Sequence, residues 1–143
     1  MRLLAPAPGW TAQADVIVVA PATARLIGSY VAGISSDLLT TTLIATRAPV
    51  VVCPAMHTEM WEHDAVQHNI SVLRSRGVFI TPPEEGRLAG GDVGKGRLAA
   101  TENIVEVMAQ ALQSQTENGA LLGKHILVTA GGTREPIDAV RVL

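Results

Sequence analysis

Two short segments rich in alanine and proline could hold a ligand through their backbones. Residues 20–24 (Ala-Pro-Ala-Thr-Ala) and 53–56 (Cys-Pro-Ala-Met) each follow an apolar, β-branched run. Small side chains let backbone N–H groups and the Thr23 hydroxyl approach a ligand where a helix begins, and phosphate is the usual ligand there. Both turns would leave the carboxyl ends of strands, the edge at which open parallel sheets bind ligands. Taken alone, each turn is more often purely structural.

The four histidines and the single cysteine show no spacing typical of a metal site or a nucleophile. His63 and His68 are five residues apart, which is off the helical i, i+4 pairing, and neither has a ligand-like spacing to His57 or His125. We therefore expect surface histidines and no metal. Cys53 ends an apolar run with no base or cation evident beside it, so we expect a buried small hydrophobe. A lone cysteine without a disulfide partner favours a reducing, cytoplasmic compartment.

Alternating strands and helices must position these turns. β-branched runs that end at proline are typical of strands buried on both faces of a parallel sheet, and apolar residues at helical spacing lie between them. The expected strands are 15–20, 49–53 and 78–80, and the expected helices are two between 23 and 46, one over 65–76 and one over 102–113. The pattern predicts an α/β fold of three layers with a Rossmann-like parallel sheet.

The two ends of the chain and one internal segment depart from that pattern. Residues 82–97 hold five glycines, and we expect a loop there rather than a regular element. Residues 1–14 have no strand pattern, so the domain over 1–113 is expected to be N-terminally incomplete. A polar linker over 114–120 and a new strand after it predict that a second α/β domain begins within 121–143.

Composition excludes several classes of function. Hydrophobic residues make up 48% of the 143 residues and charged residues 17%, which indicates a packed globular domain. Aromatic residues are only 3% and the formal net charge is −2, so neither base stacking nor attraction to nucleic acid or an anionic membrane is expected. No apolar run reaches the length of a membrane helix, and the N-terminus has no signal-peptide pattern.

Four motifs in order resemble a known family. Residues 20–24 resemble the Pro-Ala-Ser/Thr-Ala-Asn-Thr motif, and 54–61 (Pro-Ala-Met-His-Thr-Glu-Met-Trp) the Pro-x-Met-Asn-x-x-Met-Trp motif, of the cysteine-decarboxylase flavoproteins that bind FMN. Residues 86–97 resemble their substrate-clamp loop, Gly-Arg-Leu-Ala-Cys-Gly-Asp-x-Gly-x-Gly-Arg. Residues 128–138 resemble the opening of a phosphopantothenate–cysteine ligase domain. The order is similar to that of bifunctional coenzyme A biosynthesis proteins, which join the two activities.

The resemblance implies a reaction and a set of site residues. FMN would oxidise the cysteine moiety of 4′-phosphopantothenoylcysteine, CO₂ would leave, and reduction of the enethiol would give 4′-phosphopantetheine. Positions implied to bind the cofactor are Ala22, Thr23, Ala24, Arg25 and Ala55. Positions implied to bind the substrate are Met56, His57, Met60, Arg87, Ala89, Gly90 and Gly91. The resemblance also implies a trimer-based homo-oligomer, and CTP with Mg for the ligase domain of the full-length protein, opening near Gly131.

Several positions depart from the family pattern. Gly90 occupies the position of the proton-donating cysteine of the clamp loop, and glycine has no proton to give. The catalytic histidine expected just before the first strand is absent from residues 8–13. His57 replaces an asparagine; an imidazole can still donate a hydrogen bond to a carboxylate or phosphate. We therefore expect the intact protein to act in coenzyme A biosynthesis and this chain alone to be inactive.

Two other interpretations stay open at the level of sequence. The missing proton donors favour a non-catalytic, flavin-binding or regulatory paralogue of the same fold, although such a protein would have no reason to retain the ligase opening. A different flavin-dependent decarboxylase or a prenyl-transferring relative would also share the fold. The motif over residues 56–61 and the ligase segment favour the coenzyme A biosynthesis protein over such a relative.

Overall fold

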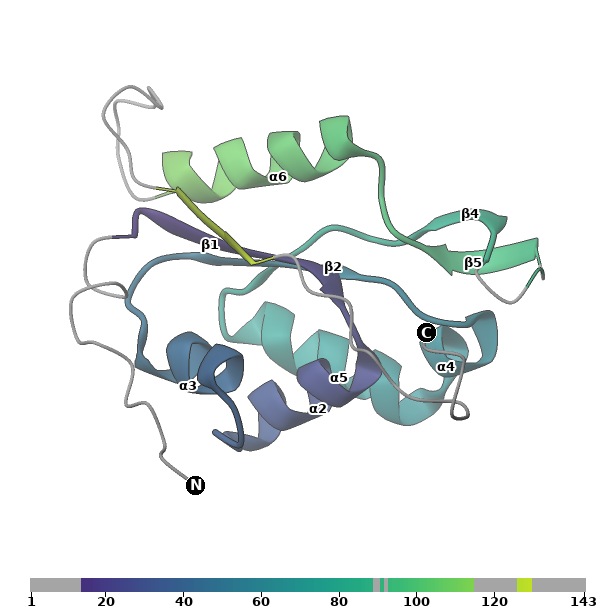
Figure 1. Ribbon diagram of the computed structural model, residues 1–143, viewed down its shortest axis with the longest axis horizontal. Coiled ribbons are helices and arrows are strands. Elements are labelled where there is room, and N and C mark those ends of the chain that lie inside the picture. The colour runs from purple at the N-terminus through teal and green to yellow at the C-terminus, as the bar shows by residue number, and fades with distance from the viewer. Residues whose placement is uncertain (1–13, 89–90, 92, 115–125, 130–143) are drawn as a thin grey trace, which may run out of the picture.

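A four-stranded parallel sheet forms the centre of the computed structural model. The structure describes residues 14–88, 91, 93–114 and 126–129. The strands of the sheet are β1 (Val16–Ala22), β2 (Val50–Pro54), β3 (Phe79–Ile80) and β6 (Ile126–Thr129). Their order is β3-β2-β1-β6, and every neighbouring pair is parallel. The chain proceeds outward from β1 to β3 and then returns to the other side of β1, so the winding direction switches at β1 (Figure 1).

Helices cover both faces of this sheet, as the alternation of elements predicted. The helices α2 (Ala24–Ala32), α3 (Leu38–Ala45) and α5 (Asp64–Ser75) lie on one face, and α6 (Thr101–Gln113) lies on the other (Figure 1). The short helix α4 (Thr58–Glu62), which we did not predict, connects β2 to α5. The three-layer α/β/α architecture is therefore confirmed.

The residues of β1 alternate between two hydrophobic cores. Ile17 and Val19 pack in the core on the side of α2 and α5, together with Ile27 and Ile70. Val16 and Val18 pack in the opposite core with Ala111 and Leu112 of α6. Because both faces of the strand are buried, every position from Val16 to Val19 is apolar and β-branched. This explains why the run reads as continuously hydrophobic.

The segment over 82–97 is not a loop as expected, but a β-hairpin. Strand β4 (Glu84–Arg87) pairs with β5 (Val93–Arg97) in an antiparallel, two-stranded sheet. Gly86 lies opposite Gly94, and the backbone at Gly91 has a φ of +94°, a conformation that glycine adopts without strain. The glycines allow the turn to form and other backbone segments to pack closely, so their number does not exclude strands here.

The strand predicted near residues 124–130 is present as β6. We expected it to open a second domain, but β6 pairs with β1 in the main sheet, from Val16 opposite Ile126 to Val19 opposite Thr129. The sheet thus has four strands where the sequence indicated three. The division into 1–113, 114–120 and 121–143 stays a prediction, since most of the last two segments and residues 1–13 lie outside the described residues. Among the described residues, no helix is long and apolar enough to cross a membrane.

Candidate functional site

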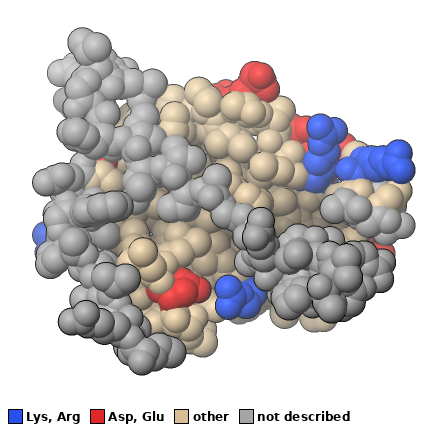
Figure 2. Space-filling model, viewed as in Figure 1, with Lys and Arg blue, Asp and Glu red and all other residues tan. Residues whose placement is uncertain are grey.

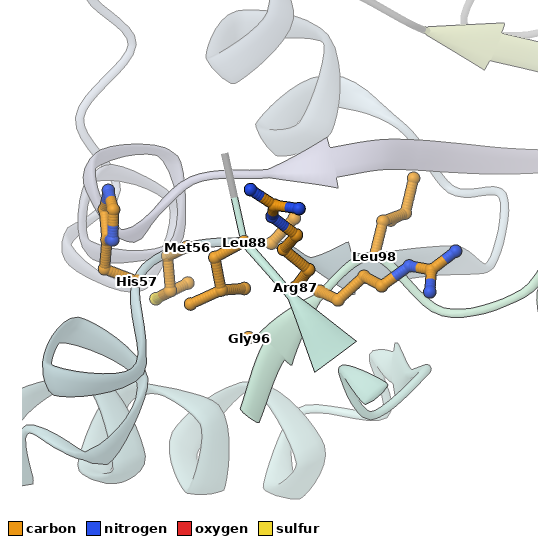
Figure 3. Close-up of a pocket in the computed structure, with 8 residues that line it drawn as sticks. Met56, His57, Arg87, Leu88, Gly96 and Leu98 are labelled. Carbon is orange, nitrogen blue, oxygen red and sulfur yellow. The ribbon is translucent and has the colours of Figure 1, made fainter. Parts of the chain in front are cut away.

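The candidate site is a pocket between the turn after β2 and the β4–β5 hairpin. Its volume is about 290 Å³, and it is lined by residues 55–57 of the turn and by residues 87–88 and 96–98 of the hairpin. In Figure 3, Met56 and Leu88 lie side by side, with His57 at one end of the group and Leu98 at the other. Two of the motifs singled out in the sequence therefore meet at one cavity.

Close backbone packing attaches the hairpin to the turn. The Met56 N–H donates to the Gly96 carbonyl oxygen at 3.0 Å. A side chain at Gly96 would overlap the Met56 carbonyl oxygen, and one at Gly94 would overlap the Thr58 hydroxyl. Glycine is thus required at both positions of β5 for the pocket to form in this shape.

The first turn lies next to the second through the parallel pairing of β1 and β2. Ala22 is opposite Pro54, and the Ala55 N–H donates to the Ala22 carbonyl oxygen at 3.1 Å. Thr23 caps α2, and its hydroxyl accepts a hydrogen bond from the Leu26 N–H at 3.3 Å. The other two first-turn amides, those of Ala24 and Arg25, have no intrahelical acceptor, which leaves them available to an anion.

The structure brings together part of the predicted site. Ala55, Met56, His57 and Arg87 line the pocket. Met60 does not: its side chain is 45% exposed on α4, outside the pocket.

The other predicted positions lie elsewhere. Ala22, Thr23, Ala24 and Arg25 form the end of β1 and the start of α2, and none of them lines the pocket, although the buried Ala22 is hydrogen-bonded to the lining residue Ala55. The remaining clamp-loop positions are Gly91, which is exposed, and Ala89 and Gly90, which lie outside the described residues.

Sequence reasoning missed four pocket residues: Leu88, Gly96, Arg97 and Leu98. All but Leu98 lie within the clamp-loop motif at 86–97, so that motif was the sequence feature that could have indicated them. Treating that motif as a loop obscured the pairing that brings its second strand to the pocket.

The described histidines occupy separate positions. His57 is exposed at the pocket, and His68 is exposed on α5. His63 is exposed as expected, but it also caps α5, because its Nδ1 accepts a hydrogen bond from the Ala65 N–H at 3.2 Å. Within the described residues, no group of three His, Cys, Asp or Glu side chains is placed to hold a metal ion. His125 lies outside those residues.

Cys53 is a buried core residue, as predicted. It is fully buried in the core below α6, and its Sγ lies 3.6 Å from the Thr81 hydroxyl. Burial raises the pKa of the Cys53 thiol, an effect that the hydrogen bond with Thr81 partly offsets. The thiol is therefore neutral at ordinary pH and unsuited to act as a nucleophile.

Asp37 begins α3 through a capping box. Its Oδ1 accepts from the Thr40 N–H at 2.8 Å, and its own N–H donates to the Thr40 hydroxyl at 3.3 Å. The hydrogen bond from the Thr40 backbone is the main reason that the pKa of the Asp37 carboxyl lies below its ordinary value of 3.8. Arg25, 3.9 Å away and largely exposed, adds a weaker effect.

Replacing Asp37 by alanine should lower the free energy of unfolding by about 1 kcal/mol, because the first turn of α3 loses its cap. A carboxyl with a lowered folded-state pKa stabilises the protein above pH 3.8 and loses this contribution as the pH falls through the folded value. Urea unfolding of wild type and Asp37→Ala at pH 7 and pH 3 checks both points, with Asp37→Asn as a control that retains a cap. An equal difference between wild type and Asp37→Ala at the two pH values would contradict the linkage.

Comparison with known proteins defines the class. The family model described as Flavoprotein matches residues 6–113, and the chain belongs to this family. Residues 121–143 match the DNA/pantothenate metabolism flavoprotein C-terminal domain.

Particular relatives are the coenzyme A biosynthesis bifunctional proteins CoaBC. Those of Bacillus subtilis and Escherichia coli K12 are 52% and 46% identical to the chain, over 90% and 91% of its length. The chain spans only 31% of each of these relatives.

Two solved structures share the fold. A mutant PPC decarboxylase complexed with pantothenoylaminoethenethiol is 32% identical with a TM-score of 0.63, and the FMN binding protein AtHal3 is 34% identical with a TM-score of 0.62. Each match covers 71% of this chain and 56% of the solved chain. The family resemblance noted in the motifs is thereby confirmed, as is the Rossmann-like parallel sheet of a flavoprotein decarboxylase.

Proposed function

We propose that this chain forms part of the flavin and substrate site of a phosphopantothenoylcysteine decarboxylase in coenzyme A biosynthesis. The observation that carries the proposal is the pocket shared by residues 55–57 and the hairpin, because two motifs distant in sequence converge on one cavity. The CoaBC relatives and the neighbouring PPC decarboxylase support the same activity. The full-length protein would also carry the CTP- and Mg-dependent ligase, whose opening the match at 121–143 supports.

The residues present fit a bound FMN. The small side chain of Ala55 lines the pocket, the Ala22 side chain is buried beside it, and the Ala24 and Arg25 amides at the start of α2 suit an anionic or carbonyl group. FMN, when bound, would accept the electrons that the cysteine moiety loses. Ala22, Thr23, Ala24, Arg25 and Ala55 would hold it.

Substrate would bind in the pocket and under the hairpin. Met56 offers an apolar surface, and exposed His57 can donate a hydrogen bond to a carboxylate or phosphate. Arg87 supplies positive charge from β4. Met60, Ala89, Gly90 and Gly91 complete the proposed substrate set from α4 and the hairpin turn.

The proposal includes an assembly and a location. Ile34, Leu38 and Ile44 are 46–60% exposed on or just before α3, which supports a homo-oligomer, trimer-based as in the resembled family. The buried free thiol of Cys53 supports a cytoplasmic location.

The second candidate is a flavin-binding protein without catalysis, and the glycine at position 90 favours it. No side chain at that position can protonate the enethiol. The catalytic histidine that the family pattern places just before the first strand is also absent from residues 8–13, so we expect this chain alone to bind FMN without releasing CO₂ at an enzymatic rate.

The test uses the 143-residue chain. We expect it to quench the fluorescence of added FMN, and 4′-phosphopantothenoylcysteine, but not 4′-phosphopantothenate, to change the spectrum of the bound flavin. Ala55→Leu should weaken flavin binding by filling the cavity, whereas Ala45→Leu, an equal change at the exposed end of α3, should leave it intact. Absence of flavin binding would refute the proposed site. Binding of flavin without any spectral response to 4′-phosphopantothenoylcysteine would favour the second candidate. Rapid CO₂ release would show that the chain is active alone.

A further inference from the structure

Two arginines of the hairpin line the pocket without a carboxylate partner. Arg87 comes from β4 and Arg97 from β5. Within the part of the chain that the structure describes, neither Arg87 nor Arg97 forms an ion pair within 4.0 Å. Both pocket guanidinium groups therefore keep their full charge and hydrogen-bonding capacity for a ligand.

The nearby glutamates do not neutralise this charge. Glu84, opposite Arg97 in the hairpin register, uses its Oε1 to accept hydrogen bonds from the Ala100 N–H and the Asn103 side chain, each at 2.9 Å. Glu85 lies opposite Lys95, which does not line the pocket. Figure 2 shows Lys and Arg atoms at the end of the molecule formed by β4 and β5, with Asp and Glu atoms beside them. The pocket lining itself includes Arg87 and Arg97 and no carboxylate among the described residues.

Glycine at position 86 makes room for the Arg97 side chain. A Cβ placed at Gly86 would lie 3.1 Å from Arg97 Cδ and 3.4 Å from its Nη1. The stem of Arg97 therefore lies over the backbone of β4, and its exposed guanidinium group stays accessible to a ligand.

We propose that Arg97 binds a phosphate monoester at this pocket, to which Arg87 adds a second positive charge. Guanidinium groups bind phosphate through short, charge-assisted hydrogen bonds. The inference deepens the proposed function and rests on it: the phosphate is that of the phosphopantothenoyl substrate. The 5′-phosphate of FMN has the same chemistry, but the free amides at the start of α2 provide a separate site for an anion of the flavin.

Calorimetric titration of the 143-residue chain with 4′-phosphopantetheine and with pantetheine tests the proposal. We expect the phosphorylated compound to bind on the order of tenfold or more tightly at low salt, and added KCl to reduce this preference. Arg97→Gln should remove the preference and Arg97→Lys should retain part of it. Lys95→Gln is the matched control, because it removes the same charge from the same strand outside the pocket, and it should keep the preference.

A second arm compares FMN with riboflavin in the same variants. If Arg97→Gln abolishes only the preference for FMN, the phosphate site stands, but its ligand is the flavin. If Arg97→Gln and Lys95→Gln lose the preference for the phosphorylated compound equally, the preference comes from the general electrostatic field of the hairpin and the proposal is overturned. An unchanged preference in Arg97→Gln would also overturn it. A wild-type chain that binds flavin but shows no preference for phosphate would overturn this inference alone, whereas failure to bind flavin counts against the proposed function.

Discussion

Replacing Gly96 by alanine is expected to separate the hairpin from the turn after β2 and to destroy the pocket. The added methyl group would overlap the Met56 carbonyl oxygen, and the backbone of Gly96 has a φ of +156°. The overlap cannot be relieved by rotating a side chain, because the opposing atom belongs to the backbone. It would also break the hydrogen bond from the Met56 N–H to the Gly96 carbonyl oxygen. We expect a loss of about 3 kcal/mol in the free energy of unfolding, or displacement of the hairpin.

Two measurements separate these outcomes. Urea unfolding reports the loss of stability, and FMN fluorescence quenching together with phosphopantetheine titration reports the loss of the pocket. Gly28→Ala is the matched control, since its added methyl group would make only an ordinary contact of 3.7 Å with the Asn69 side chain in a helix. A Gly96→Ala chain with wild-type stability and ligand binding would show that the hairpin does not pack on the turn as described.

Replacing Trp61 by alanine is expected to cost about 3–5 kcal/mol of stability, the usual cost of removing a large buried aromatic side chain. Trp61 is 7% exposed and belongs to the core beneath α2 and α5. It anchors α4, the helix that directly follows Met56 and His57, so its loss should also weaken ligand binding at the pocket. Urea unfolding followed by circular dichroism measures the first effect.

Met60→Ala provides the comparison, because Met60 precedes Trp61 in the same motif but is 45% exposed. Its substitution should change the free energy of unfolding by less than about 0.5 kcal/mol. If Met60 binds substrate as proposed, Met60→Ala should still lower affinity for the substrate. Similar stabilities for Trp61→Ala and wild type would exclude the structural role assigned to Trp61.

The central fold could be predicted because its determinants are local. The runs now seen as β1 and β2 are β-branched and buried on both faces, so their pattern does not depend on distant contacts. Their proline ends mark where the site turns begin. Family motifs then indicated half of the pocket residues, namely Ala55 to His57 and Arg87.

The remaining features depend on contacts that local sequence does not specify. Glycine content argued against strands at 82–97, but the glycines at 94 and 96 are needed because Thr58 and Met56 pack against them. The position of Arg97 at the pocket follows from the hairpin register, which no local pattern indicates. The partner of β6 likewise could not be inferred, because a strand of four residues carries little information about its neighbour.

The place of β6 has a consequence for how the two family matches relate to each other. β1 belongs to the first match and β6 to the second, yet they share a ladder of backbone hydrogen bonds. Cutting the chain after residue 113 would remove β6 and leave β1, in which Val16 to Val19 are buried, with an unpaired edge, and such an edge invites pairing with other molecules. In this chain strand pairing therefore joins the two matched segments, and β6 takes the edge position of the sheet in place of β1.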